Sequence, residues 1–72
     1  MTQRRYLHRA EAAQYLTDRY FPVSEQRLAV YARLGGGPVF QKAGRLPIYK
    51  PKNLDSWARS KLSQPVRSNA DI

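Results

Sequence analysis

The sequence predicts a mainly α-helical fold with one β-hairpin, built as a single domain over residues 6–62. Two helix patterns come first, a glycine-containing turn between two β-prone runs follows, and a third helix pattern comes last. A chain of 72 residues has room for only one domain, which buries roughly 60% of the surface of the unfolded chain. The expected order of elements is therefore helix, helix, strand, strand, helix around one small core.

The first helix is predicted over residues 9–16, where helix formers predominate and apolar side chains recur at helical spacing. His8 stands at the position where Ser, Thr, Asp or Asn usually caps a helix, and Glu11 suits the positive end of the helix dipole. Pro22 lacks a backbone N–H and pushes the preceding residue out of helical geometry. We therefore expect a loop over residues 17–23.

The second helix is predicted over residues 25–34. Ser24 is a good N-cap, because its hydroxyl can accept a hydrogen bond from an otherwise unpaired amide of the first turn. The glycine run 35–37 ends the helix, since glycine readily adopts the left-handed conformation and Pro38 cannot continue. The apolar stripe of this helix faces the core, which leaves the opposite face to a partner. That opposite face carries Gln26, Arg27, Val30 and Arg33.

A hairpin is predicted next, because the β-prone runs 39–42 and 46–50 flank a short glycine-containing turn at 43–45. Pro47 lacks a backbone donor, so its strand needs an open edge or a non-bonded position there. Three cations belong to this hairpin and are expected to face a partner together. They are Lys42, Arg45 and Lys50.

The third helix is predicted over residues 51–62, since proline is favoured at the first helical position. Asp55 and Arg59 have the spacing of an ion pair on one helix face and are expected on the outside. The inward face is expected to carry Leu54, Trp57 and Ala58.

The two ends of the chain are predicted to lie outside the folded domain. Residues 1–5 are expected to form a flexible basic arm, in which Arg4 and Arg5 are candidates for phosphate contacts. A basic terminus with no specific role is the alternative. Residues 63–72 show no periodicity and are predicted to be a disordered tail.

The charge of the chain is strongly one-sided. It holds 13 Lys and Arg against 5 Asp and Glu, a net charge of +8, and no acidic residue lies between Glu25 and Asp55. Such a positive surface attracts a polyanion, and the release of counterions from phosphates supplies most of the non-specific affinity for duplex nucleic acid. We therefore expect double-stranded DNA as the partner. The cations of the acid-free window are Arg27, Arg33, Lys42, Arg45, Lys50 and Lys52.

The order of the predicted elements is that of a winged helix-turn-helix domain. In this architecture the second helix enters the major groove, and the hairpin, called the wing, lies along the backbone or in the adjacent minor groove. The alternative is a merely solvated helix face, but such faces usually mix charges of both signs. The sequence therefore predicts DNA contacts from the second helix through Ser24, Gln26, Arg27, Val30 and Arg33.

Within the wing, Arg45 follows Gly44 at the hairpin tip, where an arginine can enter a narrow minor groove with its strong negative potential. A solvated turn arginine is the alternative. Lys42 and Lys50 flank the hairpin and are expected to touch phosphates rather than bases.

Five segments follow one another in a recognisable order: residues 10–16 (AEAAQYL), 23–28 (VSEQRL), 35–45 (GGGPVFQKAGR), 48–49 (IY) and 54–57 (LDSW). With this pattern the chain resembles the small excisionase-like winged helix-turn-helix proteins of the MerR superfamily, which include recombination directionality factors and AlpA-type regulators. The resemblance implies DNA binding, either to direct recombination of a mobile element or to regulate transcription. No apolar run approaches the ~20 residues of a membrane span, so we expect a cytoplasmic protein, associated with the bacterial nucleoid.

One winged domain contacts only a short site, and specific affinity usually comes from several copies acting together. We therefore expect cooperative, side-by-side binding to repeated sites, with DNA bending as the result and an integrase or recombinase as a further partner. Repression at a promoter is the alternative. A more distant alternative is a basic adaptor that binds an acidic protein or an anionic membrane.

Other kinds of chemistry find little support in the sequence. His8 is the only histidine and has no catalytic or metal-ligating partner at useful spacing, the carboxylates are scattered, and cysteine is absent. The glycine run follows a helix, whereas a phosphate-binding loop precedes one. We expect no enzyme activity, no cofactor and no membrane association. The aromatic residues Tyr31, Phe40, Tyr49 and Trp57 are expected in the core rather than on a base-stacking platform.

Overall fold

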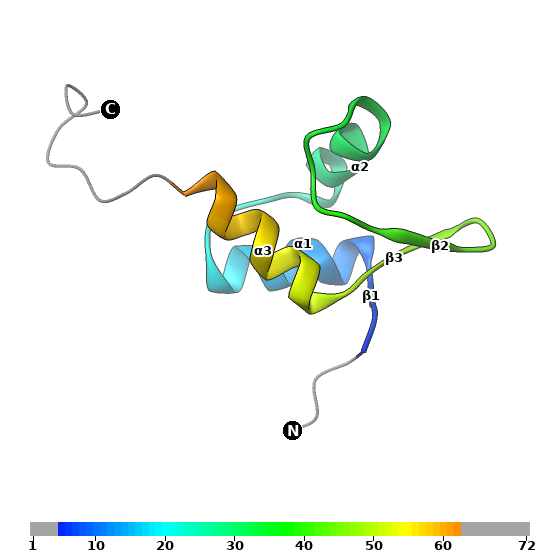
Figure 1. Cartoon of the computed structure of the whole chain (residues 1–72), viewed down its shortest axis with the longest axis horizontal. Coiled ribbons are helices and arrows are strands. Elements are labelled where there is room, and N and C mark those ends of the chain that lie inside the picture. Colours follow the sequence, from blue (N-terminus) through cyan, green and yellow to red (C-terminus); the bar gives the residue numbers. More distant parts are fainter. Residues whose placement is uncertain (1–4, 63–72) are drawn as a thin grey trace, which may run out of the picture.

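The computed structural model describes residues 5–62, and the predictions for Arg4 and for residues 63–72 lie outside this range. The described chain forms three helices and a three-stranded antiparallel sheet, a small mixed α/β fold. In chain order the elements are β1 (Leu7–His8), α1 (Arg9–Arg19), α2 (Glu25–Leu34), β2 (Gln41–Ala43), β3 (Leu46–Tyr49) and α3 (Pro51–Lys61). α1 packs against both other helices, and the hairpin β2–β3 projects away from them (Figure 1).

The sheet has the order β1-β3-β2, so the strand that contains Pro47 is central. β1 was not predicted from the sequence, and its Leu7 pairs with Tyr49 on β3. Pro47 pairs with Lys42 on β2, while β1 ends opposite Ile48 and leaves the other side of Pro47 open. Of the two arrangements predicted for this proline, an open edge or a non-bonded position, the structure has the second.

α1 begins at Arg9 as predicted, and the Glu11 carboxylate accepts a hydrogen bond from the His8 amide at 2.8 Å. The helix continues to Arg19, so the first part of the predicted loop 17–23 is wrong. Pro22 restricts only the residue before it, which leaves the residues further upstream free to stay helical. A side-chain hydrogen bond between Gln14 and Asp18, 2.8 Å long, supports this last turn.

α2 has the predicted bounds. The Ser24 hydroxyl accepts a hydrogen bond from the Arg27 amide at 3.0 Å, and Gly35 ends the helix at a φ of 94°. Gly37 is needed for a different reason, since an added Cβ would lie 2.5 Å from Cβ of Tyr31. Only glycine lets the chain pass this close to the Tyr31 side chain.

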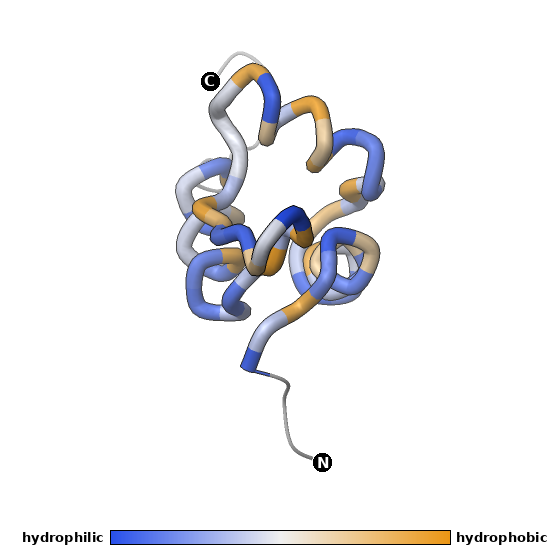
Figure 2. The backbone as a smooth tube through the Cα atoms, turned by 90° about the vertical axis from the view of Figure 1, so that its right-hand side faces the viewer, coloured by the Kyte–Doolittle hydropathy of each residue, from blue (hydrophilic) through white to orange (hydrophobic). Residues whose placement is uncertain are grey.

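The core lies where α1, α2, α3 and the sheet meet. Its buried residues are Leu7, Ala12, Ala13, Leu16, Leu28, Tyr49, Leu54 and Ala58. Hydrophobic stretches alternate with hydrophilic ones along the chain, so each helix contributes only one face to this core (Figure 2). Tyr31, Phe40 and Trp57 are partly buried against it, which confirms their assignment to the core.

Trp57 joins α3 to the two segments that flank α2. Its ring lies 5.8 Å from that of Phe21 and 5.5 Å from that of Tyr31, centroid to centroid. Its indole N–H donates a hydrogen bond to the Gly36 carbonyl at 2.9 Å. The side chain therefore joins α3 to the loop before α2, to α2 itself and to the glycine run after it.

Asp55 does not form the predicted outer pair with Arg59. Its Oδ1 atom accepts hydrogen bonds from the hydroxyls of Tyr15 at 2.8 Å and Tyr20 at 2.9 Å. Asp55 is half-buried against the end of α1, whereas Arg59 is exposed. The carboxylate thus ties α1 to α3, because it satisfies two tyrosine hydroxyls that would otherwise lose water on packing.

Candidate nucleic-acid interface

The outer face of α2 gathers most of the residues that were predicted to read DNA. Gln26 and Arg27 are exposed, Val30 is half-buried, and these three form a hollow of about 230 Å³ with Ser24. We call it the α2 hollow. Since Ser24 accepts from the Arg27 amide, its own hydroxyl hydrogen remains available to a ligand.

Arg33 lies apart from this hollow, at the other end of α2. It borders a second depression, of about 300 Å³, between α2 and the hairpin. We call this depression the basic groove. Its lining residues are Arg9, Ala29, Ala32, Arg33, Phe40, Lys42, Arg45 and Pro47. The groove brings the predicted wing residues Lys42 and Arg45 together with the last cation of α2.

Lys50 does not join them. It is the residue before α3, and its ammonium lies 5.8 Å from the centre of the Tyr6 ring. The guanidinium of Arg5 lies 5.9 Å from the same ring. Lys50 and Arg5 are therefore neighbours through Tyr6, a second basic position outside the basic groove. Lys50 was predicted to act with Lys42 and Arg45, but strand β3 ends before it and the chain turns into α3.

Arg9 is the residue of the basic groove that the sequence did not reveal. Its Nε–H donates to the Tyr49 hydroxyl at 3.0 Å, and its guanidinium lies 5.6 Å from the centre of the Phe40 ring. The two rings stack on each other with centroids 5.4 Å apart. One signal in the sequence pointed to Arg9. A cation in the first turn of a helix is disfavoured by the helix dipole, so its presence there indicates a contact outside the helix.

None of the described residues that line the basic groove is acidic, so its four cations have no carboxylate among the lining side chains. Glu25 stands at the opposite end of α2 from Arg33, and Asp55 is occupied by the two tyrosine hydroxyls. Four cations around one small depression repel one another. An anion with several oxygen atoms would relieve this repulsion and would be held by charge-assisted hydrogen bonds.

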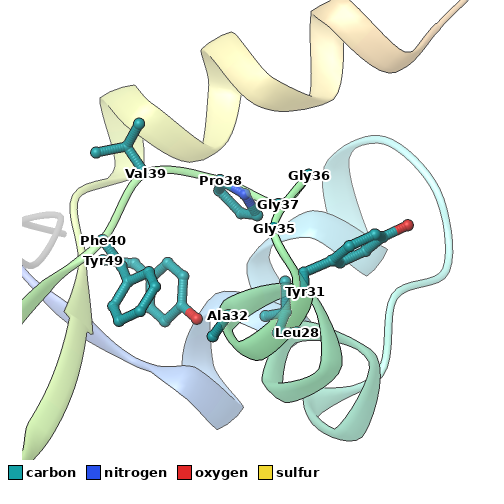
Figure 3. Close-up of a pocket in the computed structure, with 10 residues that line it drawn as sticks. All are labelled: Leu28, Tyr31, Ala32, Gly35, Gly36, Gly37, Pro38, Val39, Phe40 and Tyr49. Carbon is teal, nitrogen blue, oxygen red and sulfur yellow. The ribbon is translucent and has the colours of Figure 1, made fainter.

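A third depression, of about 300 Å³, has a different character (Figure 3). It lies between α2 and the segment that follows it, with the Phe40 and Tyr49 rings at one end and Leu28 and Ala32 beside them. None of the described residues that line this apolar cleft carries a charge. It offers no cationic side chain to a phosphate, although it shares Ala32 and Phe40 with the basic groove.

Within residues 5–62, no group of three or more His, Asp and Glu residues could hold a metal ion. No helix in this part of the chain has the length and apolar character required to cross a membrane. The sequence matches no protein-family model, and it matches no curated protein either. The candidate interface is thus defined by its geometry and charge: the α2 hollow and the basic groove, both on α2.

Proposed function

We propose that this protein binds double-stranded DNA as a winged helix-turn-helix domain. α2 would lie in the major groove, and the hairpin β2–β3 would lie against the backbone and the adjacent minor groove. The observation that carries this proposal is the acid-free basic groove between α2 and the hairpin, continued along α2 by exposed Gln26 and Arg27. A B-DNA major groove is about 12 Å wide and admits one helix.

The two depressions suit different parts of the duplex. Arginine and glutamine are the side chains that pair with guanine and adenine edges, so Arg27 and Gln26 in the α2 hollow are assigned to base contacts. Ser24, at the start of α2, is assigned to a phosphate. Lys42 is exposed on a strand and presents a flexible point charge, which suits a phosphate rather than a base.

Salt-dependent binding of fluorescent duplexes by four variants tests this division. Arg27→Ala should relax the preference for particular base pairs by about 1–3 kcal/mol, whereas Lys42→Ala should weaken all duplexes alike and lower the salt slope by about 1. Arg59→Ala is the matched control, because Arg59 is exposed but borders neither depression. The proposal is wrong if Arg27→Ala and Arg45→Ala both leave duplex binding unchanged. Binding to anionic vesicles that persists in excess duplex DNA would instead support a basic adaptor.

For the biological role we propose an excisionase-type recombination directionality factor. Several copies would bind side by side on repeated sites and bend the DNA for an integrase or recombinase. The support is the resemblance of the sequence motifs and the small size of the interface, since one such domain contacts a short site and gains specificity through neighbouring copies. Footprinting tests this role: an extended tract of repeats beside an attachment site is expected. A single inverted repeat over a promoter would overturn it in favour of a transcriptional regulator.

A further inference from the structure

Arg9 differs from the other cations of the basic groove in how firmly it is held. Arg33, Lys42 and Arg45 are exposed, but Arg9 is half-buried. Its Nε–H is bound to the Tyr49 hydroxyl at 3.0 Å, and its guanidinium lies over the Phe40 ring at 5.6 Å and the Tyr49 ring at 6.0 Å. Tyr49 is itself only 1% exposed, so the support of this arginine belongs to the core.

These contacts leave the ligand-binding edge of the guanidinium open. The hydrogen bond of Arg9 uses Nε. Within residues 5–62, its Nη1 and Nη2 groups donate no hydrogen bond to another side chain. A guanidinium fork matches two oxygens of one phosphate. Because the side chain is already ordered, binding a phosphate costs less conformational entropy than it would for a free surface arginine.

The cations around Arg9 favour a phosphodiester backbone as the ligand. Arg33 on α2 and Lys42 and Arg45 on the hairpin border the same groove as Arg9. A duplex that spans from α2 to the hairpin must carry its backbone across the space between them, which is the position of the groove. A single small anion would leave part of this charge uncompensated, whereas a phosphodiester backbone presents phosphates in succession.

We infer that Arg9 is a phosphate-binding residue that receives one backbone phosphate of duplex DNA at the crossing from α2 to the hairpin, with Tyr49 as its positioning residue. The inference rests on the proposed DNA binding. It assigns a role to the start of α1, an element that the predicted interface did not include.

The test is the salt dependence of duplex binding, measured by fluorescence anisotropy with Arg9→Ala and Arg19→Ala. Arg19 is the matched control, because it lies on the same helix and its guanidinium also covers a tyrosine ring, 4.6 Å from the centre of the Tyr15 ring. Arg19 borders neither the α2 hollow nor the basic groove. Arg9→Ala should weaken all duplexes roughly ten-fold and lower the slope of log K against log salt by about 0.9. Arg19→Ala should leave the slope unchanged.

Two further variants separate geometry from charge. Arg9→Lys keeps the charge but loses the fork, so the slope should stay while affinity falls by several-fold. Tyr49→Phe removes only the hydroxyl, and it should likewise lower affinity at an unchanged slope. Circular dichroism and thermal unfolding of each variant give the folded fraction, and affinities are corrected for it.

Single methylphosphonate substitutions in the duplex locate the phosphate without depending on the stability of one variant. At the phosphate that Arg9 binds, the losses of binding free energy caused by the neutral linkage and by Arg9→Ala should not be additive. At all other positions the two losses should add. If the wild-type protein binds duplex DNA but no position shows this coupling, or if Arg9→Ala behaves like Arg19→Ala, the role of Arg9 is overturned and the proposed function stands. If the wild-type protein binds no duplex at any salt concentration, both fail.

Discussion

The α1–α3 pair and the outer part of the hairpin, residues 41–46, use their residues in opposite ways. The base of the hairpin is different, since Tyr49 at the end of β3 is buried in the core. α1 and α3 bury Ala12, Leu16, Leu54 and Ala58 completely, each at 0% exposure. Every residue of β2 is exposed. The helix pair also contains the two tyrosine hydrogen bonds to Asp55, while the hairpin contributes Lys42 and Arg45 to an acid-free groove.

This difference separates the part that supports the fold from the part that presents charge. Like charges around the basic groove oppose folding, and a small domain can tolerate them only if another region supplies the stability. α2 stands between the two regions. Its inner face buries Leu28 and touches Trp57 through Tyr31, and its outer face carries Arg27 and Arg33.

The same substitution made in both regions should have very different effects on stability. Leu54→Ala empties a fully buried site and should lower the free energy of unfolding by about 2–5 kcal/mol. Leu46→Ala, at a residue 44% exposed on β3, should cost less than about 1 kcal/mol. Urea denaturation followed by circular dichroism measures both. Equal losses would mean that the hairpin supports the fold as much as the helix pair does.

Local signals in the sequence were sufficient for most of the fold. The Ser24 cap, the glycine run and Pro51 gave the bounds of α2 and the start of α3, because each acts on neighbouring residues only. The hairpin followed from a glycine turn, where Gly44 adopts a φ of 68°. The residues of the α2 hollow followed from helical spacing, since the face opposite an apolar stripe must be exposed.

Contacts between distant residues were beyond those signals. β1 is two residues long and exists only through its pairing with β3. Asp55 binds Tyr15, 40 residues away, so a rule for neighbours on one helix wrongly paired it with Arg59. Arg9 binds Tyr49 across the same separation of 40 residues, and for the same reason the interface predicted from the sequence did not include Arg9. Lys50 was grouped with the cations of the hairpin, but β3 ends one residue before it, so Lys50 lies outside the basic groove.

Asp55 should matter for stability and not for DNA affinity. Asp55→Ala removes the acceptor of the Tyr15 and Tyr20 hydroxyls, which should cost about 1–2 kcal/mol of unfolding free energy, since the group is only half-buried. Asp18→Ala removes the same charge but loses only an exposed hydrogen bond with Gln14, worth about 0.2–0.5 kcal/mol. Thermal unfolding of the two variants side by side makes the comparison.

Once corrected for the folded fraction, the two aspartate variants should bind duplex DNA equally, because they carry the same net charge and neither residue borders the α2 hollow or the basic groove. A specific loss of affinity in Asp55→Ala alone would show that the α1–α3 pair shapes the interface and does more than support it.

The smallest effect on stability is expected at the tip of the hairpin. Gly44 has a positive φ of 68°, and nothing lies within 4 Å of an added Cβ, so a substitution there meets only backbone strain. In the left-handed region that strain is about 1–2 kcal/mol for alanine. Because β2 is exposed throughout, the tip can open without unfolding the core, and Gly44→Ala should lower the global unfolding free energy by less than about 1 kcal/mol.

The strain should show instead in the hairpin and in its contact with DNA. Amide hydrogen exchange at Ala43 and Leu46, the pair that closes the turn, should speed up in Gly44→Ala, and duplex affinity should fall because Arg45 is no longer held beside the basic groove. Gly44→Asn is the matched variant, since asparagine tolerates the left-handed conformation and should restore most of both properties. If Gly44→Ala lowers global stability as much as Leu54→Ala does, the tip cannot open independently of the core, and the separation of supporting helices from a presenting hairpin is wrong.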